Sequence, residues 1–210
     1  MIDGPHGLRL SRVYYADSKG YHRLSKTQSH STNFKYLSRK KRIHLSNNKT
    51  EDYSNYSNVY YQYATALPIA TAMAQSFNLE LIENYGKIVR KELEMYKIDL
   101  LLAPGLNIHR NILCGRNFEY YSEDPYISGK MAGAMVRGVQ SHKNKGATIK
   151  HFAGNNQEKN RFNSNSKISE RALREIYLKG FQIAIKESNP VALMTSYNLI
   201  NGIHPASNEQ

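Results

Sequence analysis

The stretch IDLLLAPG, residues 98–105, is a short apolar run that ends in Pro-Gly. A run of this length closed by a turn signal is typical of a buried strand. In the residues before it, apolar side chains recur every three or four positions, which predicts an amphipathic helix. They are Leu79, Ile82, Tyr85, Val89, Leu93 and Tyr96. The sequence here therefore predicts a helix that leads into a buried strand.

The same alternation continues toward the C-terminus. A helical pattern over residues 128–140 precedes the apolar run ATIKHF, residues 147–152, and a helix opening near Ser169 and Glu170 precedes VALMTSYN, residues 191–198. The apolar face of this last helix is formed by Leu173, Ile176, Tyr177, Phe181, Ala184 and Ile185. Alternating helices and strands favour an α/β fold with parallel strands, and both a doubly wound sheet and a (β/α)₈ barrel fit the pattern.

Length and composition limit the class of protein. With 210 residues, 40% of them hydrophobic, the chain is long enough for one globular domain with a core. The one cysteine, Cys114, excludes an internal disulfide and a metal site built from several cysteines. There is no apolar run of about 18 residues, and the N-terminus MIDGPHGLRL lacks the pattern of a signal peptide. We therefore expect a cytoplasmic protein without a membrane segment.

The positive charge is concentrated in one region. The net charge is +12, and nine Lys and Arg residues but no Asp or Glu lie between Lys19 and Lys49. Residues 18–62 are also rich in Ser, Asn, His and Tyr and show little apolar periodicity, which predicts a long, irregular and poorly ordered basic insertion. The cluster RKKR at 39–42 has the charge to bind a polyanion, but a solvated charged loop is the favoured interpretation, and a nucleic-acid partner is not expected.

Polar residues follow three consecutive predicted strands. The first strand leads into PGLNIHRNILCGRNFEYYSEDP (104–125), the second ends in Lys150 and His151, and the third ends in MTSYN (194–198). Because the carboxyl ends of parallel strands meet at one edge of a sheet, these residues predict a shared polar pocket. Adjacent residues on a strand face opposite sides, so one of Lys150 and His151 is expected to point inward.

Several kinds of chemistry lack their sequence motifs. There is no Gly-rich phosphate loop, no zinc-type histidine spacing and no G-x-S-x-G, so neither a cofactor nor a metal is expected. The polar residues instead suit a polyhydroxylated ligand. They are Arg116, Lys150, His151, Arg161 and Tyr197, with the acids Asp3, Glu119, Glu123, Asp124 and Glu158. Two alternatives are open: Glu123 and Asp124 are better explained as a cap before the next helix, and Glu158 as a partner of Arg161.

Five blocks resemble glycoside hydrolase family 3, in its β-glucosidase-like branch. They are DGPHGLR (3–9), residues 103–130, KHFAGNNQEKNR (150–161), SERALREIYLKGF (169–181) and MTSYNLINGIHPASN (194–208). The resemblance covers the first nine residues and nearly everything from about Thr65 onward. It implies that residues 1–210 form part of a TIM-like barrel, with 18–62 as an insertion, and that the family activity is exo-acting, retaining hydrolysis of β-glucosides.

The resemblance also implies roles for particular residues. Asp3 would hold hydroxyls of the terminal sugar, and the same subsite would be lined by Arg116, Lys150, His151 and Arg161. Met194 and Tyr197 would form its wall near the anomeric centre. No catalytic residue is assigned, because the family nucleophile lies in a Ser-Asp-Trp-like motif one strand beyond MTSYN and the acid/base comes from a later domain.

These gaps lead to an expectation about the chain as a whole. A retaining glycosidase needs two carboxyl groups about 5–5.5 Å apart. We therefore expect a fragment, truncated at both ends, whose barrel is incomplete and whose activity alone is negligible. The alternatives are a sugar-binding fragment or subunit of a split enzyme that needs a downstream partner segment, and a nonspecific polyanion binder that uses residues 19–49.

Overall fold

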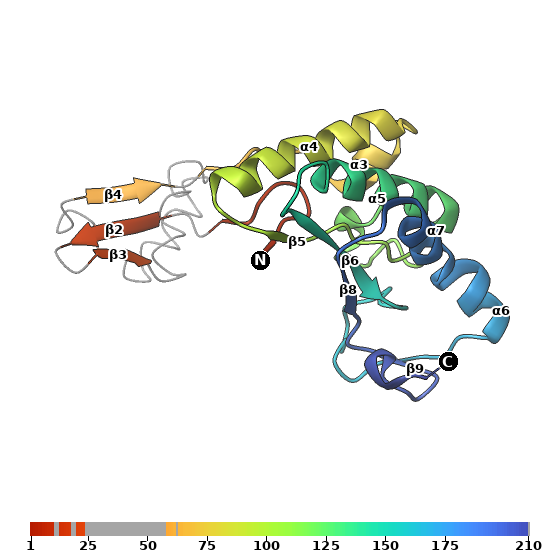
Figure 1. Ribbon diagram of the computed structural model, residues 1–210. Coiled ribbons are helices and arrows are strands. Elements are labelled where there is room, and N and C mark those ends of the chain that lie inside the picture. Colours follow the sequence, from red (N-terminus) through yellow and green to blue (C-terminus); the bar gives the residue numbers. More distant parts are fainter. Residues whose placement is uncertain (11–12, 18–19, 24–57, 62, 210) are drawn as a thin grey trace. The chain divides into compact units, whose positions relative to one another are not determined.

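The computed structural model describes residues 1–10, 13–17, 20–23, 58–61 and 63–209 (Figure 1). The chain divides into two compact units, one formed by Met1–Leu8 with Thr65–Gln210 and the other by Arg9–Ala64. Over the described ranges, no helix combines the length and the apolar character needed to cross a membrane.

A sheet of four parallel strands forms the centre of the larger unit (Figure 1). Its order is β1 (Ile2–Asp3), β5 (Leu100–Leu102), β6 (Gly146–Phe152) and β8 (Ala192–Thr195). Ile2 pairs with Leu101, Leu100 pairs with Gly146, and Thr148 pairs with Ala192. All three pairings are parallel, so the α/β prediction is confirmed and the carboxyl ends of the strands share one edge.

Helices connect the strands as the apolar periodicity predicted. The predicted helices are α4 (Leu79–Met95), α5 (Pro125–Val139), and α6 (Glu170–Ala172) with α7 (Lys179–Ser188). A short further helix, α3 (Ala70–Ala74), was not predicted. The side chains of Asn78, Asp124 and Ser169 each accept a hydrogen bond from a backbone N–H at the start of α4, α5 and α6. The interpretation of Asp124 as a cap is therefore confirmed.

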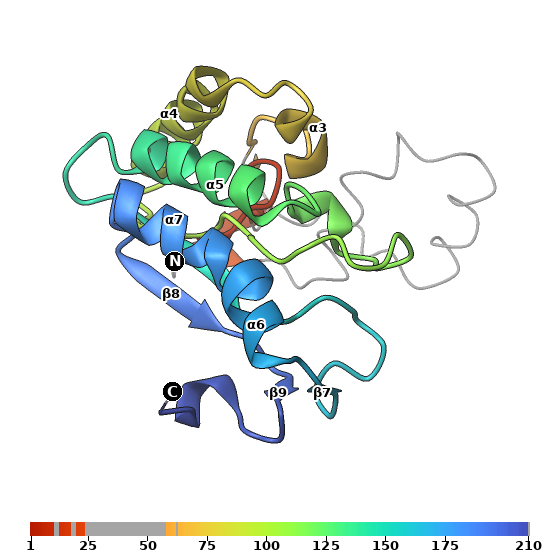
Figure 2. The same cartoon turned by 90° about the vertical axis from the view of Figure 1, so that its right-hand side faces the viewer.

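Helix α5 lies between α4 and α7 (Figure 2) and supplies much of the core. Buried side chains include Val89 and Leu93 of α4, Met131, Met135 and Val139 of α5, and Phe181 and Ala184 of α7. Helices α4 and α5 approach closely at Gly86 and Gly138. A Cβ on Gly138 would lie 2.1 Å from the carbonyl oxygen of Glu83. Leu101 and Ile149 of the sheet are also fully buried.

Two elements differ in extent from the sequence pattern. The strand expected over 98–105 is limited to β5, but the following segment still pairs with β6, since Lys150 N donates to Pro104 O at 3.0 Å and Leu106 N donates to Lys150 O at 2.7 Å. The last predicted helix is interrupted by a π-helical turn, Leu173–Tyr177, between α6 and α7. Ile185 remains exposed because α7 buries the side that carries Phe181 and Ala184.

Four short elements complete the larger unit. The 3₁₀ turns η3 (Asn117–Glu119) and η5 (Pro205–Ser207) lie in loops, and β7 (Asn165–Ser166) pairs in parallel with β9 (Leu199–Ile200).

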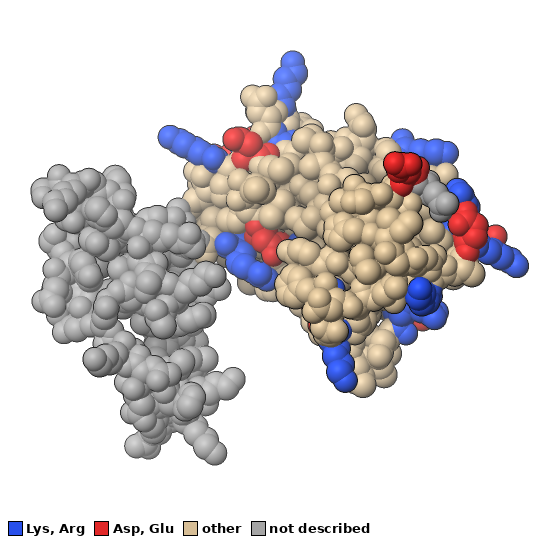
Figure 3. Space-filling model, turned by 90° about the horizontal axis from the view of Figure 1, so that it is seen from below, with Lys and Arg blue, Asp and Glu red and all other residues tan. Residues whose placement is uncertain are grey.

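On the face shown in Figure 3, acidic and basic side chains are interspersed among uncharged ones. That face therefore presents both signs of charge.

The smaller unit contains an antiparallel sheet in the order β3 (Gly20–Arg23), β2 (Val13–Asp17) and β4 (Asn58–Tyr61). The prediction of irregular chain over 18–62 is therefore wrong for residues 20–23 and 58–61. These runs of four residues are too short to show periodicity, although tyrosine and valine favour strands. Residues 24–57, with the basic cluster at 39–42, lie outside the described residues, so the rest of that prediction stays a prediction.

Candidate functional site

The polar residues at the carboxyl ends of the strands lie together. Asp3 ends β1, Arg116 lies in the loop after β5, and Lys150 ends the regular part of β6. Lys150 Nζ is 2.7 Å from Asp3 Oδ1, and Arg116 Nη2 is 2.9 Å from His151 Nε2. We call this group the strand-end cluster. Its members are Asp3, Arg116, Glu119, Lys150, His151, Glu158 and Arg161.

Lys150 is the most deeply buried cation of the strand-end cluster. Its side chain is 3% exposed, and its ammonium lies between the carboxylates of Asp3 and Glu119, with Glu119 Oε2 at 3.4 Å. The other oxygen of Glu119 accepts a hydrogen bond from Arg116 Nε. A buried ammonium needs such partners, since an unpaired charge in this position is costly. Glu119 therefore links Lys150 to Arg116. In the sequence, the spacing of three residues between Arg116 and Glu119 is the signal for the second of these contacts.

His151 is held by one buried amide. The side chain of Asn107 donates from Nδ2 to His151 O at 2.9 Å, and Asn107 Oδ1 accepts from His151 N at 2.9 Å. Because arginine only donates, His151 Nε2 accepts from Arg116, and the proton is assigned to Nδ1 from this network. His151 Nδ1 lies 3.2 Å from Asn107 Oδ1 and 3.2 Å from the hydroxyl of Tyr120.

The surroundings of His151 favour its neutral form. Burial disfavours the imidazolium, and the positive charges of Arg116, Lys150 and Arg161 disfavour it further, which together lower its pKa to about 2. His151 is therefore neutral near pH 7. In this arrangement its Nε2 accepts a hydrogen bond from Arg116, and the ring does not carry the second proton of an imidazolium.

Lys150 and His151 both point into the strand-end cluster, so the expectation that they face opposite sides is wrong. Strict alternation requires regular pairing, and the register between β6 and β8 shifts between Lys150 and Phe152. The Lys150–His151 and Phe152–Ala153 peptide bonds are cis. The irregular end of β6 therefore gives the cluster two adjacent buried polar side chains.

Arg161 joins the strand-end cluster through Glu158. Arg161 Nη1 is 2.8 Å from Glu158 Oε2, so the predicted pairing is confirmed. Glu158 Oε1 lies 3.9 Å from Arg116 Nη1 and accepts from Asn155 Nδ2 at 3.4 Å. The cluster thus contains three cations and three carboxylates, which balance in formal charge. The carboxylates are those of Asp3, Glu119 and Glu158.

Tyr197 and Met194 lie at the edge of the strand-end cluster. Met194 is partly buried on β8 and faces Lys150 in the β6–β8 register. Tyr197 is largely exposed, and its ring centroid is 5.4 Å from Arg161 Cζ.

Sequence reasoning missed Asn107, Tyr120 and Asn155, which contact His151 or each other. These are neutral loop residues, and nothing in their sequence separates them from other polar loop residues.

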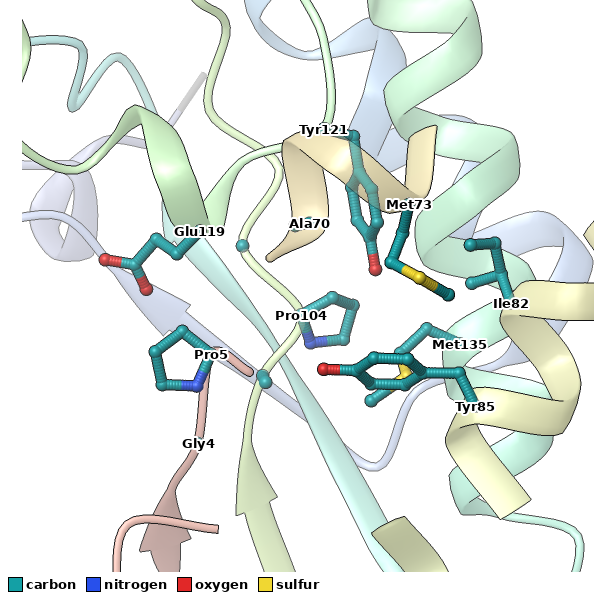
Figure 4. A pocket seen from close by; sticks show the side chains of 12 residues that line it. Gly4, Pro5, Ala70, Met73, Ile82, Tyr85, Pro104, Glu119, Tyr121 and Met135 are labelled. Atoms are coloured by element: carbon teal, nitrogen blue, oxygen red, sulfur yellow. The ribbon is translucent and has the colours of Figure 1, made fainter. Parts of the chain in front are cut away.

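A small cavity lies beside the strand-end cluster, on the side of α4 and α5 (Figure 4). Its volume is about 20 Å³, and Figure 4 shows Tyr85 and Tyr121 with their hydroxyls turned toward Pro104. Glu119 also lines it. A cavity of this size holds about one water molecule. A ligand larger than a water molecule therefore does not fit in this cavity.

Comparison with known proteins agrees with the sequence blocks and the fold. The family described as "Glycosyl hydrolase family 3 N terminal domain" matches residues 17–210. Beta-glucosidase B of Emericella nidulans is 48% identical over 145 residues, which are 69% of this chain and 17% of that protein. An exo-alpha-(1->6)-L-arabinopyranosidase of Bifidobacterium breve is also 48% identical over 145 residues, 69% of this chain and 19% of that protein.

A solved structure of beta-glucosidase 3B from Thermotoga neapolitana, in complex with alpha-D-glucose, is similar with a TM-score of 0.69 and 54% identity over 74% of this chain and 21% of that one. The chain therefore spans about a fifth of the length of such relatives. Their N-terminal domains are TIM barrels, so the four parallel strands and their helices are part of such a barrel. The chain belongs to glycosyl hydrolase family 3 and carries part of its N-terminal domain.

Proposed function

We propose that this chain holds the terminal glycosyl group of a β-glucoside in the strand-end cluster, as the sugar-binding part of a β-glucosidase-type hydrolase. The observation that carries the proposal is the direct contact between polar side chains from different strand ends, namely the ion pair of Lys150 with Asp3 and the hydrogen bond of Arg116 with the neutral His151. Relatives include proteins named as beta-glucosidases and one solved with glucose, which supports a sugar as the ligand.

Burial within the strand-end cluster separates its rim from its base. The side chains of Asp3 and Arg161 are each about a third exposed, at 32% and 31%, whereas Lys150 and Glu119 are almost fully buried. In the proposal, Asp3 and Arg161 bind sugar hydroxyls. Lys150 holds Asp3 in place, and Glu158 holds Arg161. Charged partners give strong, directional hydrogen bonds to hydroxyl groups, and a balanced cluster accepts a neutral ligand without leaving a net charge unpaired.

The proposal gives no carboxylate of the strand-end cluster a catalytic role. Retaining hydrolysis uses one carboxylate as nucleophile and a second carboxyl group as acid and base. Both oxygens of Glu119 contact cations, and Glu158 contacts Arg161 and Arg116. Carboxylates held in this way position the cations. Turnover then requires two further carboxyl groups, and we expect binding without hydrolysis from the 210 residues alone.

The test is a titration of the purified chain with glucose and with methyl β-D-glucoside, in which binding is monitored by NMR. We expect saturable binding that weakens at least tenfold in Arg161→Met, because a charged hydrogen-bond donor is lost. The matched control is Arg171→Met, since Arg171 also pairs with a nearby glutamate, Glu175 at 3.0 Å, but is exposed on α6. Absence of saturable binding, or equal affinity in the two variants, contradicts the proposal.

A separate assay tests whether a carboxylate of the strand-end cluster is catalytic. We expect no release of p-nitrophenol from p-nitrophenyl β-D-glucoside above the rate in buffer. Release that is lost in Asp3→Ala would show that the chain is active alone and would overturn this part of the proposal.

A second candidate role is that of a subunit in a split enzyme. Exposed apolar side chains lie near β8 and α7, and they are Ile185, Val191 and Leu193. Among the described residues, β8 pairs only with β6, so one edge of this strand is open to a further strand. Co-expression with the complementary part of a relative, such as that from Thermotoga neapolitana, should then restore hydrolysis, and the same activity without this chain would exclude the role.

A further inference from the structure

Glu158 places its carboxylate between two guanidinium groups of the strand-end cluster. Its Oε2 accepts a hydrogen bond from Arg161 Nη1 at 2.8 Å, and its Oε1 lies 3.9 Å from Arg116 Nη1. Oε1 also accepts from Nδ2 of the buried Asn155 at 3.4 Å. Both oxygens therefore have partners, and the carboxylate is held in place between the two arginines.

Partial exposure distinguishes Glu158 from the other glutamate that contacts Arg116. The side chain of Glu158 is 25% exposed, whereas that of Glu119 is 4% exposed and is enclosed between Arg116 and Lys150. Arg161, the direct partner of Glu158, is 31% exposed. A ligand that binds Arg161 therefore also comes close to the carboxylate of Glu158.

The formal charge of the strand-end cluster depends on Glu158. With its carboxylate, three cations face three carboxylates, and without it three cations would face two. Arg161 would also lose the carboxylate that it contacts at 2.8 Å. Because guanidinium groups bind carboxylates through strong, paired hydrogen bonds, a cluster without this charge would favour an anionic ligand over a neutral one.

We propose that Glu158 is a specificity-determining residue that restricts the strand-end cluster to neutral sugars and excludes acidic ones. This inference rests on the proposed function, which places a neutral glycosyl group in the cluster. A glucuronosyl group differs from a glucosyl group in that a carboxylate replaces the hydroxymethyl group. That carboxylate would compete with Glu158 for the guanidinium groups and would be repelled by it. Like charge placed against an unwanted ligand is a general means of discrimination.

The experiment measures the affinities of the full chain for methyl β-D-glucoside and methyl β-D-glucuronide by NMR titration at pH 7. The wild-type chain should bind the glucoside at least about tenfold more tightly. In Glu158→Gln an amide oxygen can still accept a hydrogen bond, but the charge is lost. We expect the glucuronide-to-glucoside affinity ratio to rise about five- to fiftyfold, in line with the repulsion between like charges near a protein surface. Added salt should weaken the glucuronide complex of this variant and leave its glucoside complex unchanged.

Two further variants separate the position of the charge from its presence. Glu158→Asp keeps the charge and should keep the wild-type affinity ratio. The matched control is Glu175→Gln, because Glu175 also contacts an arginine, Arg171 at 3.0 Å, but is 61% exposed and lies outside the strand-end cluster. This variant changes the net charge by the same amount and should leave the ratio unchanged.

The possible results distinguish this inference from the proposed function. A wild-type chain that binds the glucoside but takes the glucuronide equally well overturns the role of Glu158, and this measurement needs no variant. A ratio that Glu158→Gln does not raise, or that Glu175→Gln raises as much, also overturns it. Both results leave the proposed function intact. Absence of binding of both ligands by the wild-type chain overturns the proposed function and this inference with it.

Discussion

Lys150 and Asp3 are 147 positions apart in the sequence, and their side chains form an ion pair with 2.7 Å between Nζ and Oδ1. They lie on β6 and β1, which have β5 between them in the sheet. The long side chain of Lys150 therefore reaches across the end of a strand. This contact connects the first residues of the chain to its centre, so the stability of the fold and the geometry of the candidate site depend on the same pair.

Replacing Lys150 should be much more costly than replacing an exposed lysine in an equally short ion pair. Lys150→Met leaves the buried carboxylate of Glu119 facing an apolar side chain, and we expect a loss of about 3–5 kcal/mol in the free energy of unfolding. The measurement is urea unfolding followed by circular dichroism. The matched control is Lys130→Met, whose Nζ is also 2.7 Å from a carboxylate, that of Glu187, but on the surface.

The cause of that loss can be checked with a double variant. Lys150→Met combined with Glu119→Gln also removes the buried carboxylate that has lost one of its two cations, so part of the stability should return. A double variant less stable than Lys150→Met, or a Lys150→Met no less stable than Lys130→Met, would contradict the importance of the buried pair.

The hydrogen bonds between Asn107 and His151 predict the tautomer of His151. In the wild-type chain the proton should reside on Nδ1, with Nε2 as the acceptor for Arg116. Long-range ¹H–¹⁵N correlation spectra distinguish the two nitrogens directly. Asn107→Leu removes the oxygen that accepts from Nδ1, and we expect the second tautomer to appear in that variant. A proton found on Nε2 in the wild-type chain would contradict the network.

The depressed pKa of His151 should make stability depend on pH. In the unfolded chain a histidine titrates near 6.5, whereas the pKa of folded His151 is about 2. Its contribution is therefore fully present above about pH 6.5 and is lost as the pH falls toward 2, because only the unfolded chain takes up the proton. Between pH 7.5 and 5 the wild-type chain should lose about 2 kcal/mol more than His151→Gln.

That comparison uses urea unfolding at both pH values, and the ring carbon shifts of His151 provide a second measurement. They should stay at the neutral position down to about pH 4, while N-acetylhistidine in the same buffer titrates. Identical pH slopes for the two proteins, or a ring that titrates near pH 6, would show that His151 is less buried or less affected by the neighbouring cations.

Sequence alone predicted the parts of the fold that depend on local pattern. The periodicity from Leu79 to Leu93 and the capping side chains of Asp124 and Ser169 act within a few residues, so they can be read without the fold. The meeting of strand ends followed from the general rule for parallel sheets. The orientation of Lys150 and His151 did not, because the register shift at the end of β6 depends on pairing with β8.

The partners within the strand-end cluster were harder to predict. Glu119 carries the same side chain as Glu123, yet one is buried against Lys150 and the other is exposed beside a helix cap. Asn107 looks like any loop amide until it is placed against His151. Contacts between residues 44 or 147 positions apart are set by strand order and loop path, which one sequence does not display locally.

The close approach of α4 and α5 gives opposite predictions for two glycines of the same helix. A Cβ on Gly138 would lie 2.1 Å from Glu83 O and 2.8 Å from the Cα of Gly86, so Gly138→Ala forces the helices apart. We expect a loss of at least about 2–3 kcal/mol in the free energy of unfolding. A Cβ on Gly133 meets nothing nearer than 3.6 Å, and alanine there should add up to about 1 kcal/mol through its helix propensity. Both variants are compared with the wild-type chain by thermal and urea unfolding. Equal stabilities for the two variants would mean that α4 and α5 are not closely packed at Gly138. Because α5 also packs on α7 and lies beside the sheet, the arrangement of the strand ends would then need another explanation.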